Sequence, residues 1–289
     1  MGKRYFHVCT KGSDLEWMFR DDRDFVVGVN RVGICILNTD VTLLDFILMD
    51  THVHFILYGS MPECKEFIKR YKQLTGRYIF EKYHISGHLA EVDTTIVPVN
   101  TEEHLMEEMA YADRNSIAAG YKCLPTEYPW GSARYMFRDK ISSEMGTYSS
   151  PDQLTDRELR EILCSRVTIP RNWRIDLNGM IDPRCFTNVQ KAESIFKSPN
   201  RYLYFLSKKV EGSVEVRHSQ GTKSLIPDKE MRRIVEHLAV EMFGIENKTL
   251  LDVKSRILLA KKLRYEYAST PKQISRMLQL EIDIVKGFV

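Results

Sequence analysis

The sequence predicts an α+β fold: a ferredoxin-like antiparallel sheet with packed helices in the N-terminal half, and a mostly helical C-terminal region ending in a helix-turn-helix-like tail. Strand-like and helix-like segments alternate over the first half in the order β-α-β-β-α-β-α, close to a ferredoxin-like unit with a final helix. A stretch rich in Ser, Gly and Thr at residues 140–155 then marks a linker or long loop. From Lys248 onward the chain is predicted to form three short helices.

The first elements of the predicted sheet unit follow from local patterning. The run RYFHVCT at residues 4–10 predicts a strand. Apolar residues at helical spacing predict a helix from Arg23 to Leu37. Two β-rich runs come next, VTLLDFILMD at 41–50 and HVHFILYGS at 52–60, and together they predict a hairpin.

The remaining elements of this unit are one strand between two helices. A helix is predicted to start near Pro62, and the run LAEVDTTIVPV at 89–99 predicts a strand. A last helix is expected from Thr101 to about Asn115. Thr101 is a suitable cap for it, and Glu103 places an acid in its first turn.

The C-terminal half carries clear local signals but few chemical ones. Thr155 and Glu158 form a capping box ahead of LREIL, and the Asn178-Gly179 pair predicts a hairpin turn. In the tail, Thr270 is a suitable N-cap, and the break near Gln279 fits the turn of a helix-turn-helix. We therefore expect three parts, at residues 1–140, 141–245 (an accessory region without a predicted role) and 246–289 (a DNA-binding tail).

Composition limits the class of protein without identifying it. The chain has 289 residues, of which 43% are hydrophobic, so it can bury a substantial core. A net charge of +3 does not by itself require a nucleic-acid partner. The six cysteines form no CxxC pair, and no run of about 18 apolar residues or signal-like leader occurs. These features predict a reduced, cytoplasmic protein with no membrane partner.

Two histidines in the predicted hairpin are candidate metal ligands. Residues two apart on a strand point to the same face, so His52 and His54 are expected side by side, with Val53, Phe55 and Leu57 on the opposite face. Neutral imidazoles bind divalent transition metals and leave positions for other ligands. An HxH pair alone is weak, because two histidines on one strand face are more often structural or merely exposed.

The helix ending near Asn115 has an apolar and a polar side. Its apolar stripe is expected to pack on the sheet and consists of Leu105, Met106, Met109 and Ala112. Polar side chains are expected on the other side, at His104, Glu107, Glu108, Tyr111 and Asn115. Tyr111 and Asn115 are four residues apart, so their polar atoms can reach one site. The plain alternative is a tyrosine on a solvated helix face.

Two segments resemble a known family. The run MDTHVHFILYGS resembles the HUH motif of the single-tyrosine transposases. The run YADRNSIAAGYKCLPTEYPWGSARYMF is similar to the family segment in which a catalytic tyrosine precedes an asparagine by four residues, followed by Ala-Gly and Tyr-Pro-Trp-Ser-Ser signatures. The resemblance is nearest to the REP-associated tyrosine transposase branch and covers roughly Arg4 to Phe137. Departures are Asp50-Thr51, Ser116 and Gly131, where the family has Pro-Asn, proline and serine.

The resemblance implies a single-strand DNA endonuclease and strand transferase that acts through a 5′-phosphotyrosine intermediate. It places the nucleophile at Tyr111 and the metal ligands at His52, His54 and Asn115. The uncharged ligand set favours Mg or Mn. Candidate proton acceptors are Glu107, Glu108 and His104. The implied partner is single-stranded or hairpin DNA, so the protein is expected in the cytoplasm and, when bound to DNA, with the nucleoid.

Basic residues supply candidate DNA contacts. The second helix carries several, interleaved with Tyr71 and Tyr78 as candidates for base stacking. A second group follows the YPWGSARY run, and a third lies in the tail. The candidates are Lys65, Lys69, Arg70, Lys72, Arg77, Arg134, Arg138, Lys272 and Arg276. The alternative for the helical groups is a solvated face.

Two other functions are compatible with these residues. One is a DNA-binding regulator whose nuclease half is inert, although intact His52, His54, Tyr111 and Asn115 argue against it. The other is a metal-dependent phosphohydrolase that forms no covalent intermediate. The sequence predicts neither the DNA target nor whether the protein is a monomer or a homodimer.

Overall fold

The fold is α+β, as the sequence predicts, with the strands in the N-terminal half and a helical C-terminal half. The computed structural model describes residues 2–10, 17–84, 89, 92–138, 148–207, 228–245, 250–267 and 269–288. The first half of the predicted linker, residues 140–147, lies outside this part. None of the described helices is long and apolar enough to span a bilayer.

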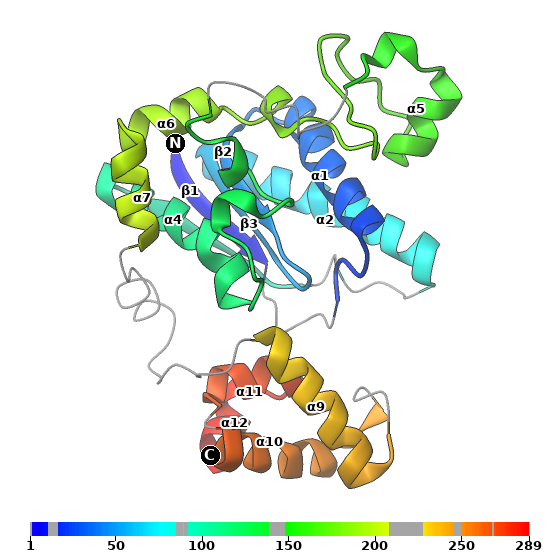
Figure 1. Cartoon of the computed structure of the whole chain (residues 1–289), viewed down its shortest axis with the longest axis vertical. Coiled ribbons are helices and arrows are strands. Elements are labelled where there is room, and N and C mark those ends of the chain that lie inside the picture. Colours follow the sequence, from blue (N-terminus) through cyan, green and yellow to red (C-terminus); the bar gives the residue numbers. More distant parts are fainter. Residues whose placement is uncertain are drawn as a thin grey trace.

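A four-stranded antiparallel sheet forms the centre of the N-terminal half (Figure 1). Its strands are β1 (Arg4–Thr10), β2 (Thr42–Leu48), β3 (Val53–Gly59) and β4 (Thr94–Val99). Their spatial order is β2-β3-β1-β4, so the two strands that are first and third in sequence lie in the middle. This arrangement is the predicted ferredoxin-like one.

Two long helices cover one face of the sheet (Figure 1). They are α1 (Asp22–Leu37), capped by Asp21, and α2 (Met61–Tyr83), which starts with a capping box between Ser60 and Glu63. Alternate strand residues such as Val8 and Phe55 point to this face and share one core with both helices. Burial of this face therefore fixes which residues point to the opposite one.

The opposite face is covered by α4 (Glu102–Ala118), α6 (Val189–Phe196) and α7 (Pro199–Ser207). Thr101 caps α4 as predicted. The stripe of Leu105, Met106 and Met109 packs with Leu44 and Ile56 of the sheet and with the helices α6 and α7.

The prediction that the polar side of α4 faces away from the sheet was wrong. Glu108 is buried and its Oε2 lies 2.6 Å from Nδ1 of His7 on β1. The helix lies between the sheet and α7, so both of its long sides are covered. Glu108 and Asn115 on its polar side therefore point toward the strands.

Residues 148–188 extend the core on the α1 side. The predicted capping box of Thr155 and Glu158 starts α5 (Asp156–Leu163). The Asn178-Gly179 turn has Gly179 at φ 82° and closes a single antiparallel bridge between Ile175 and Ile181, not a longer hairpin. Short 3-10 helices occur at Pro125–Glu127, Ala133–Tyr135, Pro151–Gln153 and Pro183–Cys185.

Four helices at the C-terminal end enclose a core of their own (Figure 1). They are α9 (Asp228–Phe243), α10 (Val253–Tyr267), α11 (Pro271–Leu278) and α12 (Ile282–Phe288). Thr270 caps α11 with Pro271 at its first position, as predicted. The helix α9 precedes the expected boundary at residue 246, but Met231, Val235 and Leu238 belong to the tail's core.

Candidate functional site

The two histidines of the HxH pair lie at the start of β3. The backbone N–H of Met49 donates a hydrogen bond to His52 O, which closes the β2–β3 turn. His52 is the residue directly before β3. The rings of His52 and His54 are 5.0 Å apart between centroids. Val53 and Phe55 point into the opposite core, as predicted. The hairpin therefore presents both imidazoles toward α4.

Asn115 on α4 faces His52 across this gap. Its amide nitrogen donates hydrogen bonds to Tyr111 O at 2.8 Å and Ala112 O at 3.2 Å within its own helix. These bonds turn the amide oxygen outward, and Oδ1 lies 3.5 Å from Nε2 of His52. Two ligands about 2.1 Å from one ion lie about 3.0 Å apart in octahedral and about 3.4 Å apart in tetrahedral coordination. The spacing of His52 and Asn115 fits one shared ion.

Tyr111 lies one helical turn before Asn115 and beside the histidines. Its ring centroid is 5.9 Å from that of His54 and 6.1 Å from that of His7, both edge-on. The side chain is half-buried. The structure therefore brings together all four residues predicted as nucleophile and metal ligands.

A chain of hydrogen bonds links His54 through His7 to Glu108 and His104 on α4. Nε2 of His7 lies 2.8 Å from Nδ1 of His54, and Nδ1 of His7 lies 2.6 Å from Oε2 of Glu108. The other carboxylate oxygen of Glu108 lies 2.8 Å from Nε2 of His104. His7, His54 and Glu108 are all buried. A histidine on the middle strand thus links the carboxylate on α4 to the HxH pair.

In the tautomer of His7 that carries its proton on Nδ1, this chain also determines which nitrogen of His54 carries the proton. The carboxylate of Glu108 only accepts, so Nδ1 of His7 is the donor, and Nε2 of a neutral His7 accepts from Nδ1 of His54. The resulting tautomer of His54 has its lone pair on Nε2, the atom through which it would bind a metal. Carboxylates behind metal-binding histidines orient the ring in this way.

Hydrogen bonding and burial in this cluster favour an ionised carboxylate on Glu108 and a neutral imidazole on His52. Burial alone would raise the pKa of Glu108, but hydrogen bonds from His7 and His104 outweigh it and lower that pKa to about 2. Burial lowers the pKa of His52 to about 4, and the charge of Arg276 acts in the same direction. His52 is therefore neutral near pH 7, the form that binds a metal ion.

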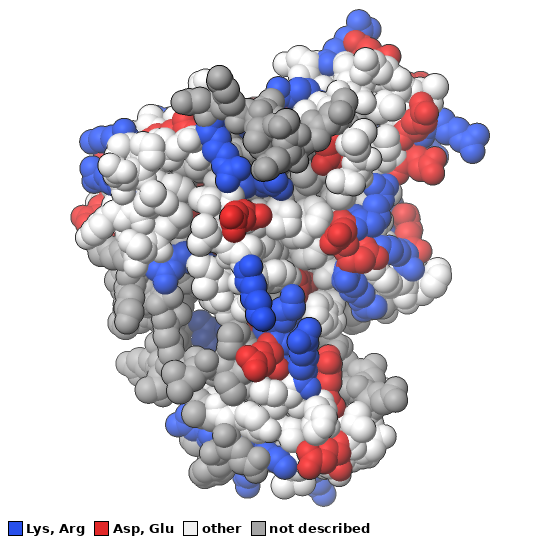
Figure 2. Space-filling model, in the orientation of Figure 1, with Lys and Arg blue, Asp and Glu red and all other residues white. Residues whose placement is uncertain are grey.

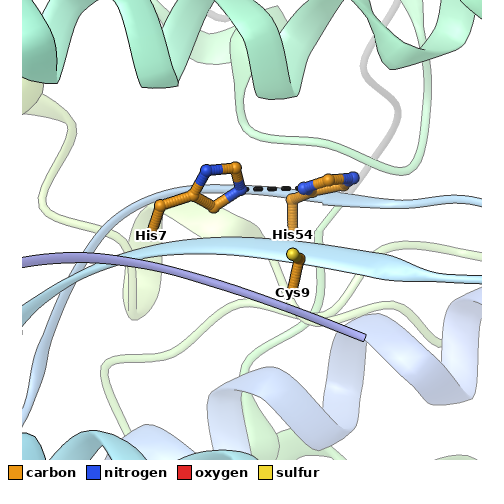
Figure 3. Close-up of side chains that lie close together, drawn as sticks. All are labelled: His7, Cys9 and His54. Carbon is orange, nitrogen blue, oxygen red and sulfur yellow. Dashed lines mark hydrogen bonds between the residues drawn. The ribbon is translucent and has the colours of Figure 1, made fainter. Parts of the chain in front are cut away.

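A second set of ligand atoms lies next to the first. His7, Cys9 and His54 each place a ligand atom within 4.8 Å of the others, on the same face of β1 and β3 (Figure 3). Figure 3 also shows the hydrogen bond between the two rings, which an ion held by both nitrogens would have to replace. Burial raises the pKa of the Cys9 thiol to about 11. The thiol thus favours its protonated form in this state.

No family model, curated protein or solved structure matches the chain. The geometry of the site therefore stands without support from relatives.

The segment around Trp130, which belongs to the second run of the family resemblance, forms hydrogen bonds with the edge strand β2. Trp130 O accepts from Leu48 N at 2.8 Å, and the hydroxyl of Tyr128 donates to Leu48 O at 2.9 Å. Gly131 pairs with Ile47, and a Cβ there would lie 3.1 Å from Phe46 O. A side chain at position 131 would therefore crowd the backbone of β2.

The predicted DNA contacts on α2 lie on the far side of the sheet from the site. Tyr71 is buried against Phe55, which points away from His54, and Tyr78 is also buried. The prediction that these two rings stack on bases was wrong, because both belong to the interior. The basic positions vary: Lys65, Lys69 and Arg77 are exposed, Arg70 pairs with Glu66 at 3.7 Å, and Lys72 donates to Val92 O.

The other predicted DNA contacts divide into two locations. Arg134 stacks on Tyr135, and Arg138 donates to Thr126 O at 3.1 Å. Lys272 and Arg276 are on α11, and their charges act on Cys9 and His52 respectively. The two tail residues therefore lie near the candidate site.

The start of α9 contacts the site from the same side. The backbone N–H of Lys229 donates to Ala119 O at 3.2 Å, at the end of α4. Nη1 of Arg232 lies 3.2 Å from Oδ2 of Asp50, two residues before His52, and Asp50 also accepts from the hydroxyl of Tyr121. Figure 2 shows Lys and Arg side chains gathered where the C-terminal helices meet the sheet body.

Sequence reasoning missed His7 and Arg232. His7 lies between the apolar residues Phe6 and Val8 of β1, and only the register of β1 against β3 sets it beside His54. Arg232 falls in the region that had no predicted role.

Proposed function

We propose that the chain is a metal-dependent enzyme that nicks and joins single-stranded DNA, of the HUH single-tyrosine transposase type. The observation that carries this proposal is the meeting of a tyrosine and an asparagine from α4 with two histidines from the β2–β3 hairpin. Tyr111 is the nucleophile, and His52, His54 and Asn115 hold the metal.

The donor set fits a divalent ion. The intrahelical bonds of Asn115 aim its oxygen at His52, and a His7 that donates from Nδ1 to Glu108 and accepts on Nε2 gives the His54 tautomer with a lone pair on Nε2. Two imidazoles and an amide bring no negative charge, which favours Mg or Mn partnered by phosphate. When bound, the ion supplies charge stabilisation to a non-bridging phosphate oxygen.

Tyr111 performs the covalent step. Its phenol oxygen attacks the scissile phosphorus, a new P–O bond forms, and the bond from phosphorus to the 3′ oxygen breaks. The phenol proton is lost and the departing 3′ oxygen gains a proton, which leaves a 5′-phosphotyrosine link and a free 3′-hydroxyl. Attack on that link by a different 3′-hydroxyl reverses the step and joins two strands, so no nucleotide cofactor is needed.

Two of the three candidate proton acceptors, Glu108 and Glu107, have different roles in this proposal. Glu108 binds both His7 and His104, so it positions His54 and does not serve as the base. Glu107 is four residues before Tyr111 and is thus its neighbour on the helix surface. We assign proton removal from Tyr111 to Glu107.

A zinc-dependent phosphohydrolase is the second candidate, because His7, Cys9 and His54 offer one thiol and two imidazoles. Thiolate and imidazole ligands are typical of zinc. This alternative requires loss of the His7–His54 hydrogen bond and ionisation of a buried thiol.

Incubation with labelled single-stranded hairpin oligonucleotides, with and without Mn or Mg, tests the proposal. We expect strand cleavage and a denaturation-resistant protein–DNA band that requires the metal and is lost in Tyr111→Phe. Tyr204→Phe is the matched control, because Tyr204 is an exposed tyrosine on α7. Multiple-turnover cleavage without a covalent band would support the hydrolase instead, and binding alone would support an inert nuclease half.

A further inference from the structure

Two turns at the start of α9 contact both elements that carry the candidate site. Lys229 binds Ala119 at the end of α4, and Arg232 binds Asp50 in the β2–β3 turn. The ammonium of Lys229 lies 4.4 Å from the ring centre of Tyr121, whose hydroxyl also binds Asp50. The C-terminal helices therefore contact α4 and the β2–β3 turn, the two elements that carry the candidate site.

Two arginines of this unit are held in place by carboxylates and an aromatic ring. The guanidinium of Arg232 lies 4.8 Å from the ring centre of Trp17, in addition to its contact with Asp50. Nη2 of Arg276 donates to Oδ2 of Asp228 at 2.6 Å. A guanidinium has five N–H donors in a rigid fork, and these contacts use only part of each.

The remaining donors lie beside the metal ligands. Nε of Arg276 is buried and has no hydrogen-bond partner in the part of the chain that the structure describes. Arg232 contacts Asp50, two residues before His52, and Arg276 contacts Asp228 at the start of α9, next to the residue that binds the end of α4. A buried guanidinium donor without a protein partner is a group that an incoming phosphate oxygen would satisfy.

We propose that Arg232 and Arg276 bind one non-scissile phosphate of the single-stranded substrate next to the metal site, so that the C-terminal helices and the sheet body bind the reacting strand together. This inference rests on the proposed function for the identity of the substrate. Asp50 and Asp228 then orient the guanidinium groups of Arg232 and Arg276, respectively. Arg276, a predicted DNA contact, binds the substrate next to the metal site in this proposal.

Equilibrium binding of a labelled single-stranded hairpin oligonucleotide, measured as a function of salt, tests this inference. The variants are Arg232→Gln, Arg276→Gln and the double variant, since glutamine keeps a donor for Asp50 or Asp228 without the charge. Arg233→Gln is the matched control, because Arg233 is the exposed neighbour on the same helix. Thermal unfolding of every variant shows whether the C-terminal core remains folded.

We expect each single variant to bind about ten-fold more weakly, as loss of a charged hydrogen bond predicts. The double variant should lower the slope of log affinity against log salt by about 0.7, the value for one phosphate of a single strand. Slopes and affinities equal to those of Arg233→Gln in folded variants would overturn the inference. So would tighter binding, because it would show that the arginines only close the helices over the site.

The binding measurement separates this inference from the proposed function. If the wild type forms no covalent adduct but the double variant has a smaller salt slope than the wild type, the nuclease proposal fails and the phosphate contact stands. A wild-type protein that forms the adduct, with unchanged binding in the variants, would do the reverse.

Discussion

Nε2 of His7 lies 2.8 Å from Nδ1 of His54, across the pairing of two central strands. Because His7 also binds the ionised carboxylate of Glu108, the proton position on His54 depends on residues that touch no substrate. Metal affinity should therefore depend on this chain as well as on the ligands themselves.

Removal of either member of the chain should weaken metal binding. We expect His7→Ala and Glu108→Gln to lower Mn²⁺ affinity by about 10–100-fold, the usual effect of losing a group that orients a ligand. Titration with Mn²⁺, followed by calorimetry, measures this effect. His237→Ala is the control, because His237 is exposed on α9. Affinities equal to that of the control would show that the chain is only structural.

The choice between the two ligand sets is tested by one substitution in each. We expect Asn115→Ala to lower Mn²⁺ affinity at least as much as His7→Ala, because it removes a ligand atom 3.5 Å from His52. Cys9→Ser should leave Mn²⁺ affinity and strand cleavage unchanged, since its thiol lies outside the proposed set. The opposite pattern, with tight zinc binding lost in Cys9→Ser, would assign the site to His7, Cys9 and His54.

The sheet and most helices were predictable because their signals are local. Helical spacing, caps such as Thr101 and Thr270, and the two β-rich runs predict elements that the structure contains. The convergence of His52, His54, Tyr111 and Asn115 was expected only through resemblance to a family. Spacing alone could not show that a hairpin and a helix more than fifty residues apart meet.

Residues whose role depends on pairing register or on distant packing were not predictable. His7 required the β1–β3 register, and the burial of Tyr71 required the packing of α2 on the sheet. Glu108 was expected to face away from the sheet, but α7 covers the other side of its helix. The contact of Arg232 with Asp50 joins positions 182 residues apart, which no local pattern encodes.

A buried carboxyl group on β2 should make stability depend on pH. Burial raises the pKa of Asp45 from its ordinary 3.8 to about 7, and Ser132 donates a hydrogen bond to its Oδ1 at 2.5 Å. A folded-state pKa above the unfolded value gives stability that is complete below pH 3.8 and is lost as pH rises through about 7. We expect this loss to be on the order of 2–4 kcal/mol.

The variant Asp45→Asn tests this pH dependence, because asparagine resembles the protonated carboxyl group. Urea unfolding at a series of pH values should show a weaker decline of the unfolding free energy in Asp45→Asn than in the wild type. Asp283→Asn, at an exposed carboxylate, should keep the wild-type decline. An unchanged pH profile in Asp45→Asn would mean that Asp45 is ionised in the folded protein.

The covalent role of Tyr111 is the central claim, and mass spectrometry of the protein–DNA adduct tests it most directly. After nuclease trimming and proteolysis, we predict one modified peptide, with a nucleotide joined through its 5′ phosphate to the side chain of Tyr111. A nucleotide on another residue such as Tyr121, or cleavage of DNA with no modified peptide at all, would contradict it.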